Sequence, residues 1–181
     1  MIHTPTELIA AAQRGDPADI ERLAEAVWPD AYRVSRAIIA QAQAAEDAAQ
    51  DACVLMFRNI GSLRNPDAFR TWFYRIVVRE ALKHKKLQTT DTPLDADPAY
   101  TQDPAAALDV WRALATLPEH LRAVIVLHYF ERLTSREVAM VLRIPDATVR
   151  FRLMTARRRL QALLQTHDAP AHPKGKELYA R

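Results

Sequence analysis

Hydrophobic residues recur every three or four positions along most of this chain, and that spacing predicts α-helices. Between residues 17 and 38 the apolar positions include Ile20, Leu23 and Val27, with charged residues between them. β-branched residues are scattered rather than alternating with polar ones, and only three glycines interrupt the 181 residues. Strands are therefore disfavoured, and we predict an all-α fold.

Capping residues place the first two predicted helices. Asp16 followed by Pro17 predicts a helix start, and Pro29 should kink or break the long helix that follows. A second helix is expected over about residues 44–60, with a stripe of mainly small residues turned inward. The members of that stripe are Ala45, Ala48, Ala49, Ala52, Cys53 and Met56.

A third helix should begin at Asn65, a capping residue that precedes Pro66, and run to about Lys86. It carries a cluster of aromatic residues. Those that share one face at helical spacing are expected in the core, namely Phe69, Phe73, Ile76 and Val77. The residues expected on the outer surface are Arg70, Trp72, Arg75, Arg79 and Lys83.

Residues 89–104 contain three prolines and four aspartates and have no hydrophobic period. This composition is typical of an extended, self-repelling linker. It divides the chain into a small helical domain over residues 1–88 and a second over residues 105–166. Residues 167–181 are expected to form a flexible tail.

The second domain has the pattern of a four-helix domain with short turns. Thr134 is placed to cap the third helix, and Glu137 stands where a capping box requires it. The turn Arg143-Ile144-Pro145 separates the third helix from the last, which predicts a helix-turn-helix. The four helices are expected over residues 105–116, 118–130, 134–142 and 146–164.

The stretch IPDATVRFRLMTARRRL, residues 144–160, is apolar on one side and rich in arginine on the other. The predicted inner stripe is Val149, Leu153, Ala156 and Leu160. A helix of this length after a short turn fits the major groove of DNA, where arginines bind guanine edges or phosphates. The alternatives are an ordinary solvated face of a bundle helix and a helix-turn-helix that binds protein.

The formal net charge of +3 conceals a partition along the chain. Residues 58–86 hold eight basic and two acidic residues, and residues 134–160 hold seven and two. The segments before each block are acidic, with nine acidic against four basic residues over 1–57 and seven against three over 87–133. One basic block usually means a solvated surface, but two blocks in these contexts favour a polyanion such as DNA.

Other classes of protein find little support. The single cysteine, Cys53, excludes a disulfide framework and has no partner for a zinc site. The six histidines show no ligand spacing, and no phosphate-binding glycine loop or catalytic Ser/His/Asp set is evident, so we expect no enzyme, no metal and no cofactor. Without a membrane-length apolar stretch or a signal-peptide pattern, we expect a cytoplasmic protein with no membrane insertion.

Three segments in order resemble bacterial RNA polymerase sigma factors of the extracytoplasmic-function (ECF) group. They are AEDAAQDACVLMFRNI, FRTWFYRIVVREALK and LATLPEHLRAVIVLHYFERLTSREVAMVLRIPDATVRFRLMTARRRL. The resemblance covers about residues 20–164 and implies a sigma factor that directs polymerase core to specific promoters for transcription initiation. Residues 1–88 would then be the region 2-like domain, and residues 105–166 the region 4-like domain.

The resemblance also implies which residues make the contacts. The polymerase core would bind at Asp47, Gln50, Asp51, Phe57 and Arg58. The −10 promoter element would be captured as single strand by the loop over residues 61–67 and the helix after it, through Asn65, Arg70, Trp72, Arg75, Arg79 and Lys83. The −35 element would be read as duplex by Arg136, Thr148, Arg150, Phe151, Met154, Thr155, Arg157 and Arg158.

Three residues depart from the family pattern. Arg143 stands in the turn where the family commonly has glycine, so the turn geometry should be strained or altered. Phe151 stands where a small polar residue is usual, and Arg79 where an asparagine is common, which leaves the promoter preference open. Family membership further allows an anti-sigma factor as a partner, and the alternative function is a free-standing helix-turn-helix transcription regulator.

Overall fold

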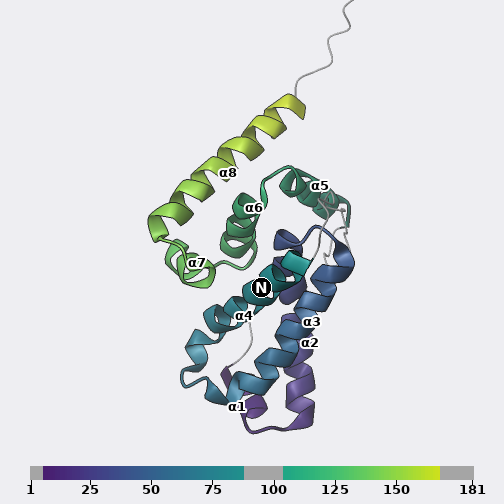
Figure 1. The fold of residues 1–181 in the computed structure, drawn as a ribbon, viewed down its shortest axis with the longest axis vertical. Coiled ribbons are helices and arrows are strands. Elements are labelled where there is room, and N and C mark those ends of the chain that lie inside the picture. The colour runs from purple at the N-terminus through teal and green to yellow at the C-terminus, as the bar shows by residue number, and fades with distance from the viewer. Residues whose placement is uncertain (1–5, 88–103, 168–181) are drawn as a thin grey trace, which may run out of the picture.

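The computed structural model describes residues 6–87 and 104–167, and within them it contains helices and no strand, as predicted. Figure 1 shows two groups of helices, which we call the first lobe (residues 6–87) and the second lobe (residues 104–167). The α-helices of the first lobe are α1 (Thr6–Gln13), α2 (Pro17–Ile38), α3 (Ala42–Asn59) and α4 (Phe69–Leu87). Those of the second lobe are α5 (Pro104–Ala115), α6 (Glu119–Ile125), α7 (Ser135–Leu142) and α8 (Asp146–His167).

Helices α2, α3 and α4 pack against one another around a stripe of small side chains on α3. The six predicted inner residues of α3 are all buried, and Ala45, Ala48, Ala49 and Ala52 are fully so. Alanine side chains are small, so they let the helix backbones approach closely. The same small side chains leave room for the aromatic rings of α4. Phe69 and Phe73 stack there with ring centroids 5.8 Å apart, and both lie in the core as predicted.

Helix α2 begins where predicted, and it is not broken at Pro29. The Asp16 side chain accepts from the backbone N–H of Ala18 at 2.9 Å and caps the helix. Of the predicted kink or break at Pro29, the structure excludes the break, because the helix continues through Pro29 to Ile38. A proline removes one helical hydrogen bond, but the fully buried neighbours Val27 and Ala31 hold the helix on the core on both sides of it.

Helix α1 has no counterpart among the predicted elements, because eight residues are too few to establish a helical period. It is fixed by its last residue. The Gln13 side-chain amide donates to the backbone carbonyls of Ile60 and Leu63, at 3.0 and 2.8 Å. These carbonyls belong to the short 3-10 turn after α3 and to its C-cap, so α1 holds the loop that leads to α4.

The second lobe contains the predicted helix-turn-helix, formed by α7 and α8. Thr134 and Glu137 form the capping box, with the Glu137 N–H donating to Thr134 Oγ1 at 3.2 Å. Arg143 ends α7 with φ 54° and ψ 45°, the left-handed conformation that glycine adopts without strain. The inner stripe of α8 is buried as predicted at Val149, Leu153 and Ala156.

The helix expected over residues 118–130 is in two parts. It is α-helical to Ile125 and continues as a π-helix, η3 (Val126–Phe130). The Glu131 N–H donates to the Val126 carbonyl at 3.0 Å, a wider turn than an α-helix makes. This extra width sets the position of Glu131, which is fully buried.

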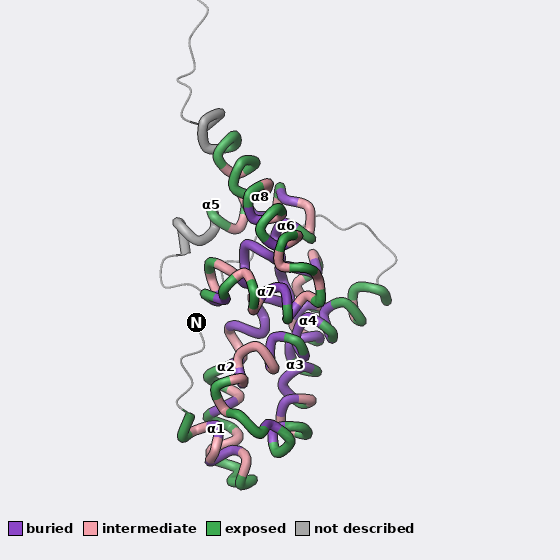
Figure 2. The backbone as a smooth tube through the Cα atoms, turned by 90° about the vertical axis from the view of Figure 1, so that its left-hand side faces the viewer, coloured by how far each residue is buried: buried purple, intermediate pink, exposed green. Residues whose placement is uncertain are grey.

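The two lobes are in direct contact. Helix α4 packs on α7, and α2 packs on α6 and η3. Buried segments occur in both lobes (Figure 2), and the buried hydrophobic residues of the two lobes form one cluster. The linker predicted over residues 89–104 lies outside the described residues except for Pro104, and the predicted tail lies outside them except for His167.

Candidate nucleic-acid and polymerase interfaces

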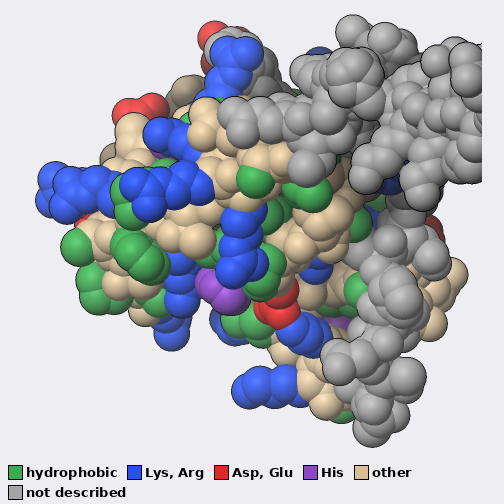
Figure 3. Space-filling view, turned by 90° about the horizontal axis from the view of Figure 1, so that it is seen from above, with side chains coloured by type: hydrophobic (Ala, Val, Ile, Leu, Met, Phe, Trp, Pro, Cys, Tyr) green, Lys and Arg blue, Asp and Glu red, His purple; other side chains and the backbone are tan. Residues whose placement is uncertain are grey.

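The outward face of α8 combines arginines with exposed apolar side chains. Phe151 is 63% exposed and Met154 is 40% exposed. The predicted −35 residues Arg136, Arg150, Arg157 and Arg158 are exposed, and Thr148 and Thr155 are half-buried. Figure 3 shows Lys and Arg side chains standing out on the upper face of the molecule, with hydrophobic side chains between them.

Several of these side chains have partners within the second lobe. Arg150 pairs with Asp146 at 3.3 Å, and the Thr155 hydroxyl donates to the Phe151 carbonyl at 3.0 Å. Arg157 lies over the ring of Tyr129, with its guanidinium carbon 5.4 Å from the ring centroid. Arg158 is exposed at the position opposite the buried stripe. The face is therefore partly ordered before any ligand is bound.

The predicted −10 residues follow α4, and the structure separates them into two groups. Arg75, Arg79 and Lys83 are exposed, and the last two pair with the buried Glu80 at 3.1 Å each. Trp72 is half-buried, with its ring 6.1 Å from that of Phe69. The other two have structural contacts: Asn65 caps the turn before α4 by accepting from the Asp67 N–H, and Arg70 donates to the Glu131 backbone carbonyl of the second lobe.

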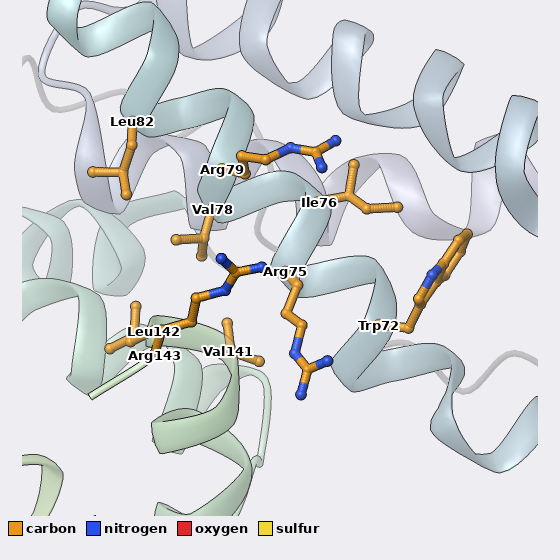
Figure 4. A pocket seen from close by; sticks show the side chains of 9 residues that line it. All are labelled: Trp72, Arg75, Ile76, Val78, Arg79, Leu82, Val141, Leu142 and Arg143. Atoms are coloured by element: carbon orange, nitrogen blue, oxygen red, sulfur yellow. The ribbon is translucent and has the colours of Figure 1, made fainter. Parts of the chain in front are cut away.

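A crevice of about 370 Å³ lies between α4 and α7. Figure 4 shows Trp72, Arg75 and Arg79 on one side of it and Val141, Leu142 and Arg143 on the other. The Arg75 Nε donates to the backbone carbonyl of Met140 at 3.2 Å, across the contact between the lobes. Part of the basic surface of α4 therefore faces the second lobe and not open solvent.

The predicted polymerase residues form a polar stripe on α3. Asp47, Gln50, Asp51 and Arg58 are exposed and recur at helical spacing, whereas Phe57 is half-buried against the core. Val54 is 47% exposed in the middle of this stripe, a candidate contact that the sequence prediction omitted. The sequence signal that could have identified Val54 is its helical spacing from the acidic residues of the stripe. The His84 Nε2 lies 2.9 Å from Asp51 Oδ2, which ties the stripe to α4.

The described residues offer no site for a metal and no membrane span. No group of three or more His, Cys, Asp or Glu side chains is placed to hold a metal ion in the part of the chain that the structure describes. Within the same residues, no helix combines the length and the apolar character needed to cross a membrane. Cys53 is buried, and this burial raises the pKa of its thiol to about 11, so it stays protonated at neutral pH.

A helix-turn-helix with an arginine-bearing outer helix, packed on the first lobe, which has its own basic surface, defines a DNA-binding protein of transcription. Residues 23–90 match the family described as Sigma-70 region 2, and residues 107–160 match Sigma-70, region 4. The chain belongs to the ECF RNA polymerase sigma factors and is a sigma factor that directs RNA polymerase to promoters. The alternative of a free-standing regulator is not favoured, because it leaves the region 2 match unexplained.

Individual relatives support this assignment. The chain is 32% identical over 163 residues to the ECF RNA polymerase sigma factor SigM of Mycobacterium tuberculosis, covering 87% of this chain and 83% of SigM. It is 28% identical over 179 residues to the RNA polymerase sigma-H factor of Pseudomonas aeruginosa, covering 88% and 93%.

Two solved structures share the fold. One is CnrH in complex with the cytosolic domain of CnrY, with a TM-score of 0.65 and 23% identity, covering 89% of this chain and 97% of that one. The other is the sigma factor RpoE in complex with the anti-sigma factor NepR from Bartonella quintana, with a TM-score of 0.68 and 19% identity, covering 81% and 97%. At these identities the likeness is one of fold.

Proposed function

We propose that the two lobes divide promoter recognition between them. The domain over residues 1–88 binds core polymerase and the −10 element as single strand, and the domain over residues 105–166 reads the −35 element as duplex. Residues 89–104 join the two and residues 167–181 form a tail. The observation that carries this proposal is the outer face of α8, where exposed arginines flank Phe151 and Met154 immediately after the helix-turn-helix turn.

The α8 face fits duplex DNA for a physical reason. Arg150 and Arg158 can bind phosphates or guanine edges, and the apolar side chains suit the thymine methyl group in the major groove. On α4, the half-buried Trp72 and the exposed Arg75 and Arg79 suit an unpaired strand, because aromatic rings stack on bases and guanidinium groups bind phosphates. The polar stripe of α3, which includes Val54, suits a basic surface of the polymerase that also offers an apolar contact.

The protein acts through binding and has no catalysis of its own. It acts in the cytoplasm, because bacterial polymerase and its DNA template are found there. An anti-sigma factor is a further partner under this proposal. Its support is the shared fold with RpoE, whose solved structure holds the anti-sigma factor NepR.

The test is transcription by purified core polymerase on fragments of the source genome, with 5′ ends mapped by sequencing. We expect starts that depend on this protein and share two upstream elements. Arg158→Ala should reduce those starts and Arg22→Ala should not, since Arg22 is exposed on α2 outside every proposed contact. Starts that lack a shared element, or that do not depend on the protein, would count against the proposal.

A further inference from the structure

The contact between the lobes is centred on one acidic residue of the second lobe, Glu131. Its side chain is completely buried. The carboxylate accepts from Arg33 Nε of α2 at 2.7 Å and from the Tyr74 hydroxyl of α4. Its backbone carbonyl accepts from Arg70 of α4. The three side chains that donate to Glu131 thus come from the first lobe, although Glu131 itself ends η3 of the second.

The hydrogen bonds to Glu131 form only when the two lobes are in contact, an arrangement that we call the closed form. A buried carboxylate costs several kcal/mol unless charged or hydrogen-bonding partners surround it, and here those partners arrive only when the lobes meet. When the lobes separate, water solvates the carboxylate instead. Arg33 then keeps its ion pair with Asp30, one turn earlier in α2. Glu131 therefore stabilises the closed form without leaving an unpaired buried charge in an open one.

Further polar contacts cross the same boundary. The buried Arg122 of α6 donates from Nε to the Ala37 carbonyl at 2.8 Å, in the last turn of α2, where a cation is favoured. Lys85 of α4 pairs with Glu119 of α6. Together with Arg75 and the Met140 carbonyl, these contacts define one relative position of the lobes.

Closure places α7 beside the surface of α4 that the proposed function assigns to the −10 element. In Figure 4 the side chains of Val141 and Arg143 face α4 from across the crevice that Arg75 and Arg79 line. A DNA strand lying along this part of α4 would need the space that α7 occupies. The closed form is therefore unable to present the full −10 surface.

We propose that Glu131 is an intramolecular latch, which holds the second lobe on α2 and α4 and keeps α7 against part of the proposed −10 surface until binding of core polymerase separates the lobes. This inference rests on the proposed function for its biological consequence, but its structural part does not. The free protein is mostly closed. Its apparent affinity for promoter partners is therefore the affinity of the open form multiplied by the fraction of molecules that are open.

The structural part is tested on the full chain, free in solution, by distance measurement between two spin labels. Labels at Glu21→Cys on α2 and Gln161→Cys on α8, both exposed positions, report the separation of the lobes in a Cys53→Ala background. We expect one narrow distance population for the otherwise unchanged chain. Glu131→Gln should raise the separated fraction about tenfold or more, the effect of losing a charge-assisted hydrogen bond.

Matched controls keep the result interpretable. Glu137→Gln makes the same chemical change in the same lobe, but within the capping box, so it should leave the distances unchanged. If Glu131→Gln loses helical circular dichroism, Tyr74→Phe decides, because it removes only the hydroxyl that donates to Glu131. Unchanged distances in the folded latch variant, or separated lobes in the unaltered protein, would overturn the latch.

A functional arm separates this inference from the proposed function. In the mapped-start assay, the latch variant should reach half-maximal transcription at a several-fold lower protein concentration than the unaltered chain. If the lobes open but neither protein supports any starts, the latch stands and the proposed function fails. If starts occur normally and the lobes never respond to Glu131→Gln, the proposed function stands and the latch fails.

Discussion

Arg157 lies across the ring of Tyr129, with its guanidinium carbon 5.4 Å from the ring centroid and its Nε donating to the Tyr129 hydroxyl. This contact joins the middle of α8 to η3, in addition to the buried stripe of α8 that packs on the lobe. Arg157 therefore has a structural part in addition to its proposed contact with DNA. Arg150 and Arg158 are exposed on the same face.

Replacing Arg157 by Ala should weaken both stability and DNA binding. Loss of the cation–π contact and the hydrogen bond should cost about 1 kcal/mol of unfolding free energy, and loss of a DNA contact about 1 to 3 kcal/mol of −35 binding. Arg150→Ala should weaken DNA binding alone, because its only ion pair in the described residues is an exposed one with Asp146. Urea unfolding and promoter-fragment titration measure the two effects, and equal stabilities would contradict the structural part.

Phe151 should influence promoter preference and not stability. At 63% exposure its ring contributes little to the core, so Phe151→Ser should change the unfolding free energy by less than about 0.5 kcal/mol. The lost apolar contact should relax selection at one base pair of the −35 element by about 1 kcal/mol. Selection of bound sequences from a randomised −35 library measures this. An unchanged preference at every position would remove Phe151 from the base contacts.

The periodic parts of the fold were predictable, and the contacts between lobes were not. The inner stripes of α3 and α8 and the capping box of Thr134 follow from residues three or four positions apart, where local geometry determines the outcome. Glu131 instead meets partners 98 and 57 positions away, Arg33 and Tyr74, and no local pattern signals such a pair. In sequence it reads as a solvated acid at the end of an apolar run.

Pro29 and Arg70 show the same limit for individual residues. Proline disfavours a helix interior locally, yet burial on both sides of Pro29 keeps α2 continuous. Arg70 was predicted on the outer surface, and it instead donates to the Glu131 carbonyl in the contact between the lobes. In both cases tertiary packing overrides a correct local rule.

Replacing Asp51 by Lys should impair polymerase binding and leave the fold intact. Asp51 is exposed on α3, and reversing its charge should oppose a basic polymerase surface and disturb the pairing with His84. We expect at least about a tenfold loss in affinity for core polymerase, measured by co-elution or fluorescence titration. Glu21→Lys, the same charge reversal on the exposed part of α2, is the control. Normal co-elution of the Asp51 variant would take this residue out of the interface.

Arg143→Gly should stabilise the protein. Arg143 adopts φ 54° and ψ 45°, a conformation that costs a residue with a Cβ about 1 kcal/mol and costs glycine much less. The variant should therefore unfold at a higher urea concentration, with a gain of about 0.5 to 1 kcal/mol. Arg136→Gly is the opposite control, since that residue is helical and glycine there should cost about 1 kcal/mol. A loss of stability in the Arg143 variant would show that its side chain matters more than its backbone.

The thiol of Cys53 should make stability fall at alkaline pH. Burial raises its pKa to about 11 in the folded protein, whereas an unfolded chain releases the proton near pH 8.5. Between these values the unfolded state binds fewer protons, so the contribution of the thiol to stability is present below about pH 8.5 and is lost as the pH rises through 11. The loss should reach about 2 to 3 kcal/mol by pH 10.5. Urea unfolding of the protein and of Cys53→Ala at pH 8 and pH 10.5 isolates this effect, because other ionisations, including that of Tyr74, are common to both, and identical pH dependences would contradict it.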